Sequence, residues 1–200
     1  IGERDDLTVL PNDFVIAGFL IEHSQCRIIH TGGTVCRENR SCVGEAAAQA
    51  LRGLFIDLAF ISASSWGMRG LSTPTEDKVM VKKAIVEASR RRILLSDTSK
   101  YGKVATYLAL PMAAFDAIIT DEGLPAVARE AIEQAGIALL TAEKEEYART
   151  GIRMKVRYRC QVRALHWLQR RRVHAIRGAF VQPIPRGRLA SLFGAVPSCS

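Results

Sequence analysis

Short, continuous apolar runs recur between residues 7 and 141, and longer amphipathic stretches separate them. The runs are rich in Ile, Leu, Val or Phe, which favours strands that helices cover on both faces. Strands that alternate with helix-length segments indicate βαβ units and a largely parallel sheet. The fold class is therefore predicted to be α/β, a three-layer Rossmann-like domain with a mainly parallel sheet. We predict strands at residues 7–10, 27–30, 58–62, 93–96, 117–120 and 137–140.

Two of the intervening helices carry local start and stop signals. Thr73, Pro74 and Glu76 have the spacing of a capping box, which predicts Thr73 as the N-cap of a helix that runs to about residue 91. A second helix begins at Pro125 and ends before Gly136, a residue type favoured just after a helix. Weaker patterns predict helices over residues 13–22 and 43–54.

A change in charge near residue 147 divides the chain. Residues 1–146 hold 16 Lys and Arg and all 20 Asp and Glu, a net charge of −4, whereas residues 147–200 hold 12 Lys and Arg and no acid. We predict one folded domain in residues 1–146. Residues 147–200 are predicted to be an irregular basic tail that forms no folded domain and packs poorly against the core.

Two interpretations of this tail stay open. Twelve cations without an acid suit an arm that binds nucleic-acid backbones. Alternatively, the tail is a frame-shifted continuation of the coding sequence. A shifted reading frame in GC-rich DNA often encodes a polypeptide that is rich in Arg, Ala and Pro and free of acidic residues.

The composition argues against several protein classes. No apolar run approaches the roughly 18 residues of a membrane helix, and the charged N-terminus does not resemble a signal peptide. The five cysteines form no Cys-x-x-Cys pair and have no metal-ligand spacing with the four histidines. We therefore expect a cytoplasmic protein with reduced thiols, no membrane contact, no metal and no cofactor.

Four polar loops follow predicted strands, which is where parallel α/β proteins bind ligands. Their glycines let backbone N–H groups approach an anion, their hydroxyls donate to phosphate oxygens, and a lysine adds positive charge. Together they favour a phosphorylated small molecule, although each loop alone is also an ordinary turn. The loops are residues 31–34 (Thr-Gly-Gly-Thr), 62–65 (Ser-Ala-Ser-Ser), 97–102 (Asp-Thr-Ser-Lys-Tyr-Gly) and 121–123 (Asp-Glu-Gly).

Three longer motifs carry a family resemblance. Residues 71–82, Leu-Ser-Thr-Pro-Thr-Glu-Asp-Lys-Val-Met-Val-Lys, resemble the LTTP-x-E-E-x-x-V-K signature of DeoR-type transcriptional regulators. Residues 97–102 resemble the family's D-x-S-K-F/Y-G loop, and residues 118–125 resemble its L-I-T-D-x-G-L-P segment. Shorter matches near residues 7–12, 32–33 and 43–44 extend the resemblance from about residue 6 to residue 142.

The resemblance implies the C-terminal effector-sensing domain of such a regulator, with a fold similar to that of ribose-phosphate isomerases and CoA-transferases. That domain binds a phosphorylated sugar or a related metabolite and so controls operator DNA binding by an N-terminal helix-turn-helix domain. We expect this chain to lack that DNA-binding domain, together with the family's first sensor strand and its phosphate loop. We also expect a homo-oligomer, since regulators of palindromic sites are usually dimers or tetramers.

Site residues follow from the resemblance, position by position. The motifs imply that Thr73 caps the long helix and that Lys82 and Lys100 contact an anion, although a solvated surface lysine is an equally open interpretation of Lys82. Ser64 stands in a loop where many family members have Ala-Asp-Gly, so a hydroxyl replaces a carboxylate there. The predicted ligand-binding residues are Gly32, Gly33, Ser64, Thr73, Lys82, Asp97, Ser99 and Lys100.

An enzyme of the same fold, a sugar-phosphate isomerase, is the alternative function. It needs a base beside an anion site, and Asp97 and Asp121 are candidates by position. The loops match the regulator pattern, however, and the loop that is acidic in many family members is rich in Ser in this sequence. We therefore expect no catalytic residue.

Overall fold

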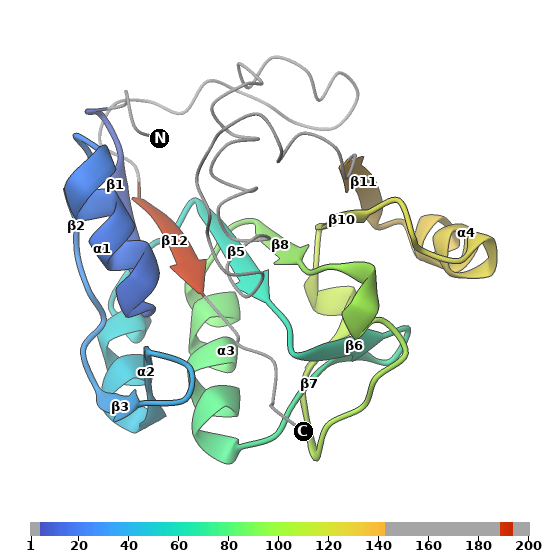
Figure 1. Cartoon of the computed structure of the whole chain (residues 1–200), viewed down its shortest axis with the longest axis horizontal. Coiled ribbons are helices and arrows are strands. Elements are labelled where there is room, and N and C mark those ends of the chain that lie inside the picture. Colours follow the sequence, from blue (N-terminus) through green and yellow to red (C-terminus); the bar gives the residue numbers. More distant parts are fainter. Residues whose placement is uncertain (1–4, 143–188, 194–200) are drawn as a thin grey trace.

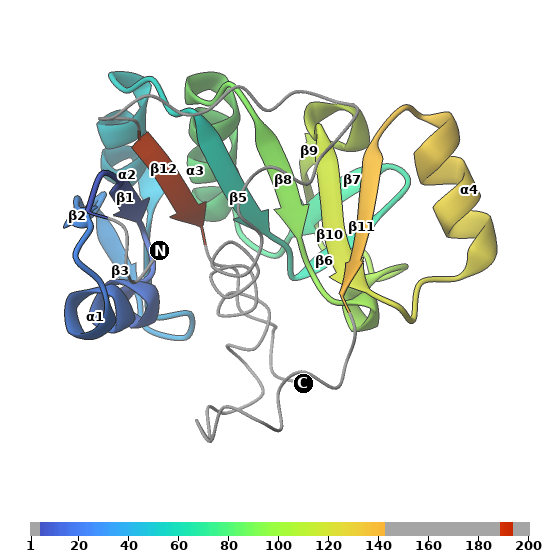
Figure 2. The same cartoon turned by 90° about the horizontal axis from the view of Figure 1, so that it is seen from above.

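The apolar runs of the sequence form the strands of one parallel sheet. The computed structural model describes residues 5–142 and 189–193, and its main sheet has seven strands in the order β11-β10-β8-β5-β12-β1-β2, with every neighbouring pair parallel. Figure 2 shows them side by side with a common direction. The predicted mainly parallel α/β fold is confirmed. The strands are β1 (Thr8–Pro11), β2 (Arg27–Ile28), β5 (Leu58–Ser62), β8 (Arg92–Leu95), β10 (Ala117–Asp121), β11 (Ala138–Ala142) and β12 (Leu189–Phe193).

Helices pack on both faces of this sheet and complete the three layers. Helix α1 (Phe14–His23) covers one face, where Leu20 belongs to the same buried cluster as Val9 and Phe60. Helices α2 (Gly44–Arg52), α3 (Glu76–Ala88) and α4 (Ala126–Gln134) pack on the other face, and α2 and α3 lie side by side (Figure 1). Their buried side chains form the larger core with the strands, including Leu51, Ile85, Leu94, Ile118 and Ile132.

Two small antiparallel sheets were not predicted. Strands β3 (Thr34–Cys36) and β4 (Ser41–Val43) form a hairpin before α2, and β6 (Ser65–Gly67), β7 (Gly70–Thr73) and β9 (Tyr107–Pro111) form a three-stranded sheet. Gly70 has a φ of 130°, and a Cβ there would lie 2.0 Å from the Leu110 carbonyl oxygen. Pairing of β7 with β9 thus needs glycine at this position.

The predicted capping box is wrong, because long-range strand pairing takes up Thr73. Thr73 is the last residue of β7 and pairs with Tyr107 of β9. Helix α3 therefore begins at Glu76, with Thr75 as N-cap and no side-chain cap hydrogen bond. It ends at Ala88 rather than near residue 91, because the Ala88 carbonyl accepts the Ile56 N–H at 2.9 Å in an isolated parallel bridge between Ile56 and Ser89. The predicted start and end of the second helix are confirmed. Helix α4 begins directly after Pro125, and Gly136, just beyond its end, has a φ of 72°.

One part of the predicted tail lies inside the sheet. Leu189–Phe193 forms β12, whose Ser191 pairs with Leu10 of β1 on one side and with Ala59 of β5 on the other. The prediction that the tail packs poorly is wrong for this segment, because an apolar run there occupies the gap between β1 and β5 and pairs with both. The rest of residues 147–200 lies outside the described residues.

Within residues 5–142 and 189–193, every helix is too short or too polar to cross a lipid bilayer.

Candidate functional site

The carboxyl ends of β5, β8 and β10 meet at one edge of the sheet. These three strands are parallel neighbours, so the loops that follow them are adjacent. The structure therefore brings together the loop of Ser64, the turn of residues 97–100 and the loop that begins at Asp121. Gly32 and Gly33 follow β2 at the same edge, but β12 and β1 separate β2 from β5. Lys100 follows β8, one strand beyond β5. At about 4.8 Å per strand, β2 and β8 are about 19 Å apart, so the glycine pair and Lys100 do not follow neighbouring strands.

The turn after β8 is shaped by its first residue. Asp97 is the N-cap of a short 3-10 helix, Thr98–Lys100, and its Oδ1 accepts hydrogen bonds from the backbone N–H of Ser99 at 3.0 Å and from the Ser99 hydroxyl. The indole Nε1 of Trp66 donates to the Asp97 carbonyl oxygen at 3.4 Å. Lys100 is half-buried at the end of this turn. The Asp97 carboxylate thus holds the loop that carries Lys100.

Asp121 joins this turn to the loop after β10. Its carboxylate is buried and accepts the Thr98 N–H at 3.0 Å, the Thr98 hydroxyl at 2.6 Å and the Gly123 N–H at 3.0 Å. From the sequence, Asp121 was predicted to lie in a polar loop after a strand and was a candidate enzymatic base, but it was not predicted to anchor the neighbouring turn. Its place at the last position of a buried strand, two residues before a glycine, was the available signal for a loop anchor.

The serines after β5 bond chiefly to β7. Ser64 Oγ donates to the Ser72 carbonyl oxygen at 3.4 Å, and Ser65 Oγ donates to the same oxygen at 3.0 Å. The hydroxyls of Ser65 and Ser72 are also within 2.8 Å of each other, and Ser72 Oγ accepts the Ala105 N–H at 2.9 Å. The Ser65 side chain is buried and hydrogen-bonded within the fold, whereas Ser64 is half-buried and makes one long hydrogen bond.

The glycine pair packs against the start of α2. A Cβ on Gly33, whose φ is 110°, would lie 2.8 Å from the Ala47 Cβ and 3.0 Å from the Val43 carbonyl oxygen. The Gly32 N–H donates to His30 Nδ1 at 3.1 Å, and the His30 ring stacks on Phe14 with centroids 4.8 Å apart. Burial lowers the pKa of His30, which favours the neutral ring that can accept this bond. His30 was not predicted as a site residue from the sequence.

Lys82 is buried rather than exposed. Only 5% of the residue is accessible, and its Nζ donates to the Ser62 carbonyl oxygen, at the carboxyl end of β5, over 2.7 Å. Burial, and next the ammonium of Lys78, lower the pKa of Lys82 to about 7. The interpretation of Lys82 as a solvated surface lysine is therefore wrong, while anion contact remains a prediction.

Three hydroxyls near the same edge are buried without a hydrogen-bond partner in the described part of the chain. They belong to Thr73 at the end of β7, Ser96 just after β8 and Thr120 in β10. Ser96 directly follows β8, and its N–H donates to the carbonyl oxygen of Ile119 at 3.1 Å, next to Thr120 in the adjacent strand β10. Buried hydroxyls usually have partners, so these three groups have unused hydrogen-bonding capacity in the described part of the chain.

The thiols of the described residues are unlinked. Cys26, Cys36 and Cys42 are free, and within residues 5–142 and 189–193 no three His, Cys, Asp or Glu side chains gather as a metal site would require.

Comparison with known proteins agrees with the motif resemblance. A family model described as the DeoR C terminal sensor domain matches residues 1–122. An uncharacterized HTH-type transcriptional regulator of Escherichia coli K12, YgbI, is 63% identical over 141 residues, which are 70% of this chain and 55% of that protein. An uncharacterized HTH-type transcriptional regulator of Haemophilus influenzae is 52% identical over 139 residues, 70% of this chain and 54% of its own length.

More distant relatives carry more specific names. A putative aga operon transcriptional repressor of Escherichia coli O157:H7 is 29% identical over 139 residues, 69% of this chain and 52% of that protein. The chain thus spans about half the length of the curated relatives it matches. Because the family model covers residues 1–122 of the 200, this chain belongs to the family of DeoR C-terminal sensor domains.

Proposed function

We propose that this chain is the effector-sensing domain of a DeoR-type bacterial transcriptional regulator and binds a phosphorylated sugar or a related metabolite. The observation that carries the proposal is that the loops after β5, β8 and β10 lie together at one edge of the sheet. The buried Nζ of Lys82 lies at the same edge, at the end of β5. Relatives named as transcriptional regulators and repressors support the regulatory role.

The chemistry of this edge suits an anion. Ser99 and Lys100 lie on one turn, Lys82 brings an amine to the end of β5, and the hydroxyls of Ser96 and Thr120 lack partners in the described part of the chain. Hydroxyls and lysines are suitable donors to phosphate oxygens. The Asp97 and Asp121 carboxylates accept loop hydrogen bonds, which fits a positioning role for both rather than general-base catalysis.

In the proposed regulator, metabolite binding at this site is coupled to DNA binding at a separate site. The bound metabolite changes how a helix-turn-helix domain elsewhere in the protein binds operator DNA, as the HTH-type names of the relatives suggest for them. The protein acts in the cytoplasm as a homo-oligomer and catalyses no reaction.

Thermal unfolding with a panel of ligands tests the proposal. Ribose 5-phosphate, glucosamine 6-phosphate and other pentose and hexose phosphates are compared with the corresponding free sugars. A true effector at about 100 times its Kd stabilises the domain by about 2.7 kcal/mol, because it binds only the folded state. If no phosphorylated sugar stabilises the chain, or the free sugars do so equally, the proposed ligand class is wrong.

Lys100→Ala tests the site itself. Loss of a charged hydrogen bond costs about 1.5–3 kcal/mol, roughly 10- to 150-fold in affinity for the phosphorylated sugar. Lys103→Ala removes an exposed lysine three residues further on and serves as the matched control with unchanged affinity. Equal weakening by both substitutions would assign the effect to general charge and remove Lys100 from the site.

A further inference from the structure

A lysine amine is held inside the protein at the edge of the proposed ligand site. Lys82 lies in α3 with 5% of its surface accessible, and its Nζ contacts the carbonyl oxygen of Ser62, the last residue of β5. Side chains of a helix lean toward its N-terminus, and α3 begins at Glu76 after the short turn from β7. The amine therefore lies at the carboxyl end of β5, where the loop of Ser64 begins.

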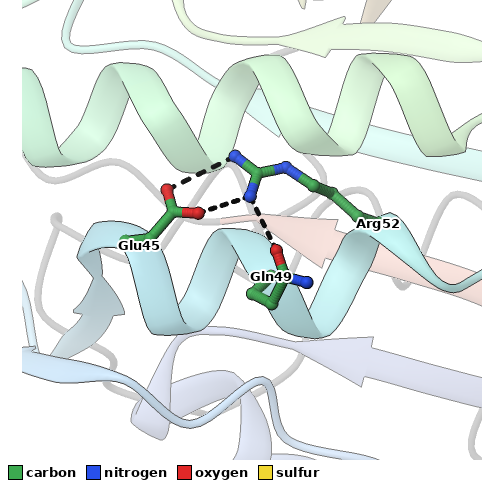
Figure 3. Close-up of polar contacts among 3 residues, drawn as sticks. All are labelled: Glu45, Gln49 and Arg52. Carbon is green, nitrogen blue, oxygen red and sulfur yellow. Dashed lines mark hydrogen bonds and ion pairs between the residues drawn. The ribbon is translucent and has the colours of Figure 1, made fainter.

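No carboxylate faces this amine from the elements that pack against α3. Among the described residues, the helices and strands that contact α3 most extensively are α2, β4, β5, β7 and β9. On α2 the charged side chains are Glu45 and Arg52, which are exposed and bond to each other and, for Arg52, to Gln49 (Figure 3). The strands carry no ionisable side chain except Cys42 in β4 and Tyr107 in β9.

The remaining charges on α3 do not supply a counter-charge either. The half-buried Lys78, one turn earlier, repels a positive charge at Lys82. The other charged residues of the helix, Glu76, Asp77, Lys83 and Glu87, are exposed. A protonated Lys82 is thus buried with a carbonyl oxygen as its hydrogen-bond acceptor and with no neighbouring anion among these elements.

We propose that Lys82 couples effector binding to proton uptake: a dianionic ligand at the carboxyl edge of the sheet supplies the counter-charge that the buried amine lacks, and the amine gains a proton when the ligand binds. The proposal rests on the proposed function, and it adds a regulatory property to the same site. The proton comes from solvent and forms an N–H bond at Nζ, while the ligand keeps its own charge. The partnerless hydroxyls of Thr73, Ser96 and Thr120 are the further donors for the ligand.

The direction of the pH effect follows from linkage. The pKa of Lys82 is about 7 in the free protein, and an adjacent anion raises the pKa of the amine in the complex. Below pH 7 the amine is protonated in both states and contributes no pH dependence. Above pH 7 binding requires a proton, so affinity falls by up to about tenfold per pH unit. A phosphate monoester has its second pKa near 6, so it is mainly dianionic above pH 7, where the predicted dependence lies.

Calorimetry with defined anions tests the coupling. The 200-residue chain is titrated with ribose 5-phosphate, and separately with sulfate, between pH 7 and 9. At pH 8, titrations in two buffers of different ionisation enthalpy count the protons taken up. We expect uptake of about one proton, a fall in affinity as the pH rises, and the same slope for sulfate, whose charge is constant.

Two variants separate Lys82 from its surroundings. Lys82→Met is expected to bind without proton uptake and with an affinity independent of pH, whereas Lys83→Met, at the exposed neighbouring position, keeps both properties of the unmodified chain. Melting curves without ligand confirm that each variant folds, and if Lys82→Met does not fold, the proton count of the unmodified chain decides.

The outcomes distinguish the two proposals. Binding of ribose 5-phosphate without proton uptake, or a slope that persists in Lys82→Met, overturns the coupling and leaves the proposed function standing. If neither anion binds at any pH, the coupling is overturned, and the proposed function is judged separately on the wider panel of sugar phosphates.

Discussion

Replacing Lys82 with methionine should stabilise the folded domain at pH 6. The ordinary pKa of 10.5 falls to about 7 in the folded chain; at 1.36 kcal/mol per unit, this is a penalty of about 5 kcal/mol against the charged side chain. Methionine has a similar length and no charge. The substitution leaves the Ser62 carbonyl oxygen without the donor it has at 2.7 Å, which costs about 1–3 kcal/mol. The expected net gain is about 2–4 kcal/mol.

The gain should depend on pH in a defined way. The unfolded lysine is protonated up to about pH 10, while the folded one loses its proton above about pH 7. The folded state then binds fewer protons than the unfolded state, so the free energy of unfolding of the unmodified chain rises between pH 7 and about pH 10. The advantage of methionine is therefore full below pH 7 and shrinks above it.

Urea unfolding followed by circular dichroism at pH 6, 7.5 and 9 measures both effects. Lys83→Met is the control, since substitution of an exposed residue usually changes stability by less than about 0.5 kcal/mol. Destabilisation by Lys82→Met at pH 6, or a gain that is constant from pH 6 to 9, would refute the assignment of Lys82 as a buried amine with a lowered pKa.

Two further substitutions test the fold around the site. Gly33→Ala should destabilise the fold more than Gly32→Ala. Both glycines have a positive φ, which costs an alanine about 1–2 kcal/mol. Only at Gly33 would the new Cβ also collide with Ala47, at 2.8 Å, which adds about 1–3 kcal/mol of overpacking. Equal losses in chemical denaturation would contradict the close approach to α2. Ser191→Pro should lower the melting temperature by roughly 2–12 °C, because proline removes a ladder donor from β12 where it pairs with β1 and β5; an unchanged melting temperature would show that the sheet does not depend on this strand.

The parallel sheet could be predicted because its signals are local. Residues 58–62 form a strand with the predicted bounds, and the strand predicted at residues 117–120 begins where predicted and is one residue longer. The strands predicted at residues 93–96 and 137–140 form with bounds that differ by one or two positions. Continuous apolar runs mark strands that are buried on both faces wherever they occur. The polar loops at their carboxyl ends followed from the same argument, since parallel strands end at one edge.

The small antiparallel sheets could not be predicted in this way. Their strands are short, and β7 (Gly70–Thr73) consists of Gly, Leu, Ser and Thr. Its partner β9 begins at Tyr107, 34 residues after Thr73, so no local pattern marks the pair. The false capping box at Thr73 has the same cause: the local motif fits a helix start, but pairing over a long distance holds the residue in a strand.

For the candidate site, sequence and tertiary structure determined different things. The sequence by itself determined which residue types follow each strand, so the glycine pair near residue 32 and the Asp-x-Ser-Lys turn at residue 97 were candidate site residues from the sequence alone. Only the tertiary structure decided that β12 lies between β1 and β5, that Asp121 holds the neighbouring turn, and that Lys82 is buried. The physical reason is that burial and strand order depend on contacts between residues far apart in the chain. A lysine in an amphipathic helix has the same local sequence signal on either face, and the packing of α3 on α2 and the sheet fixes its environment and its pKa.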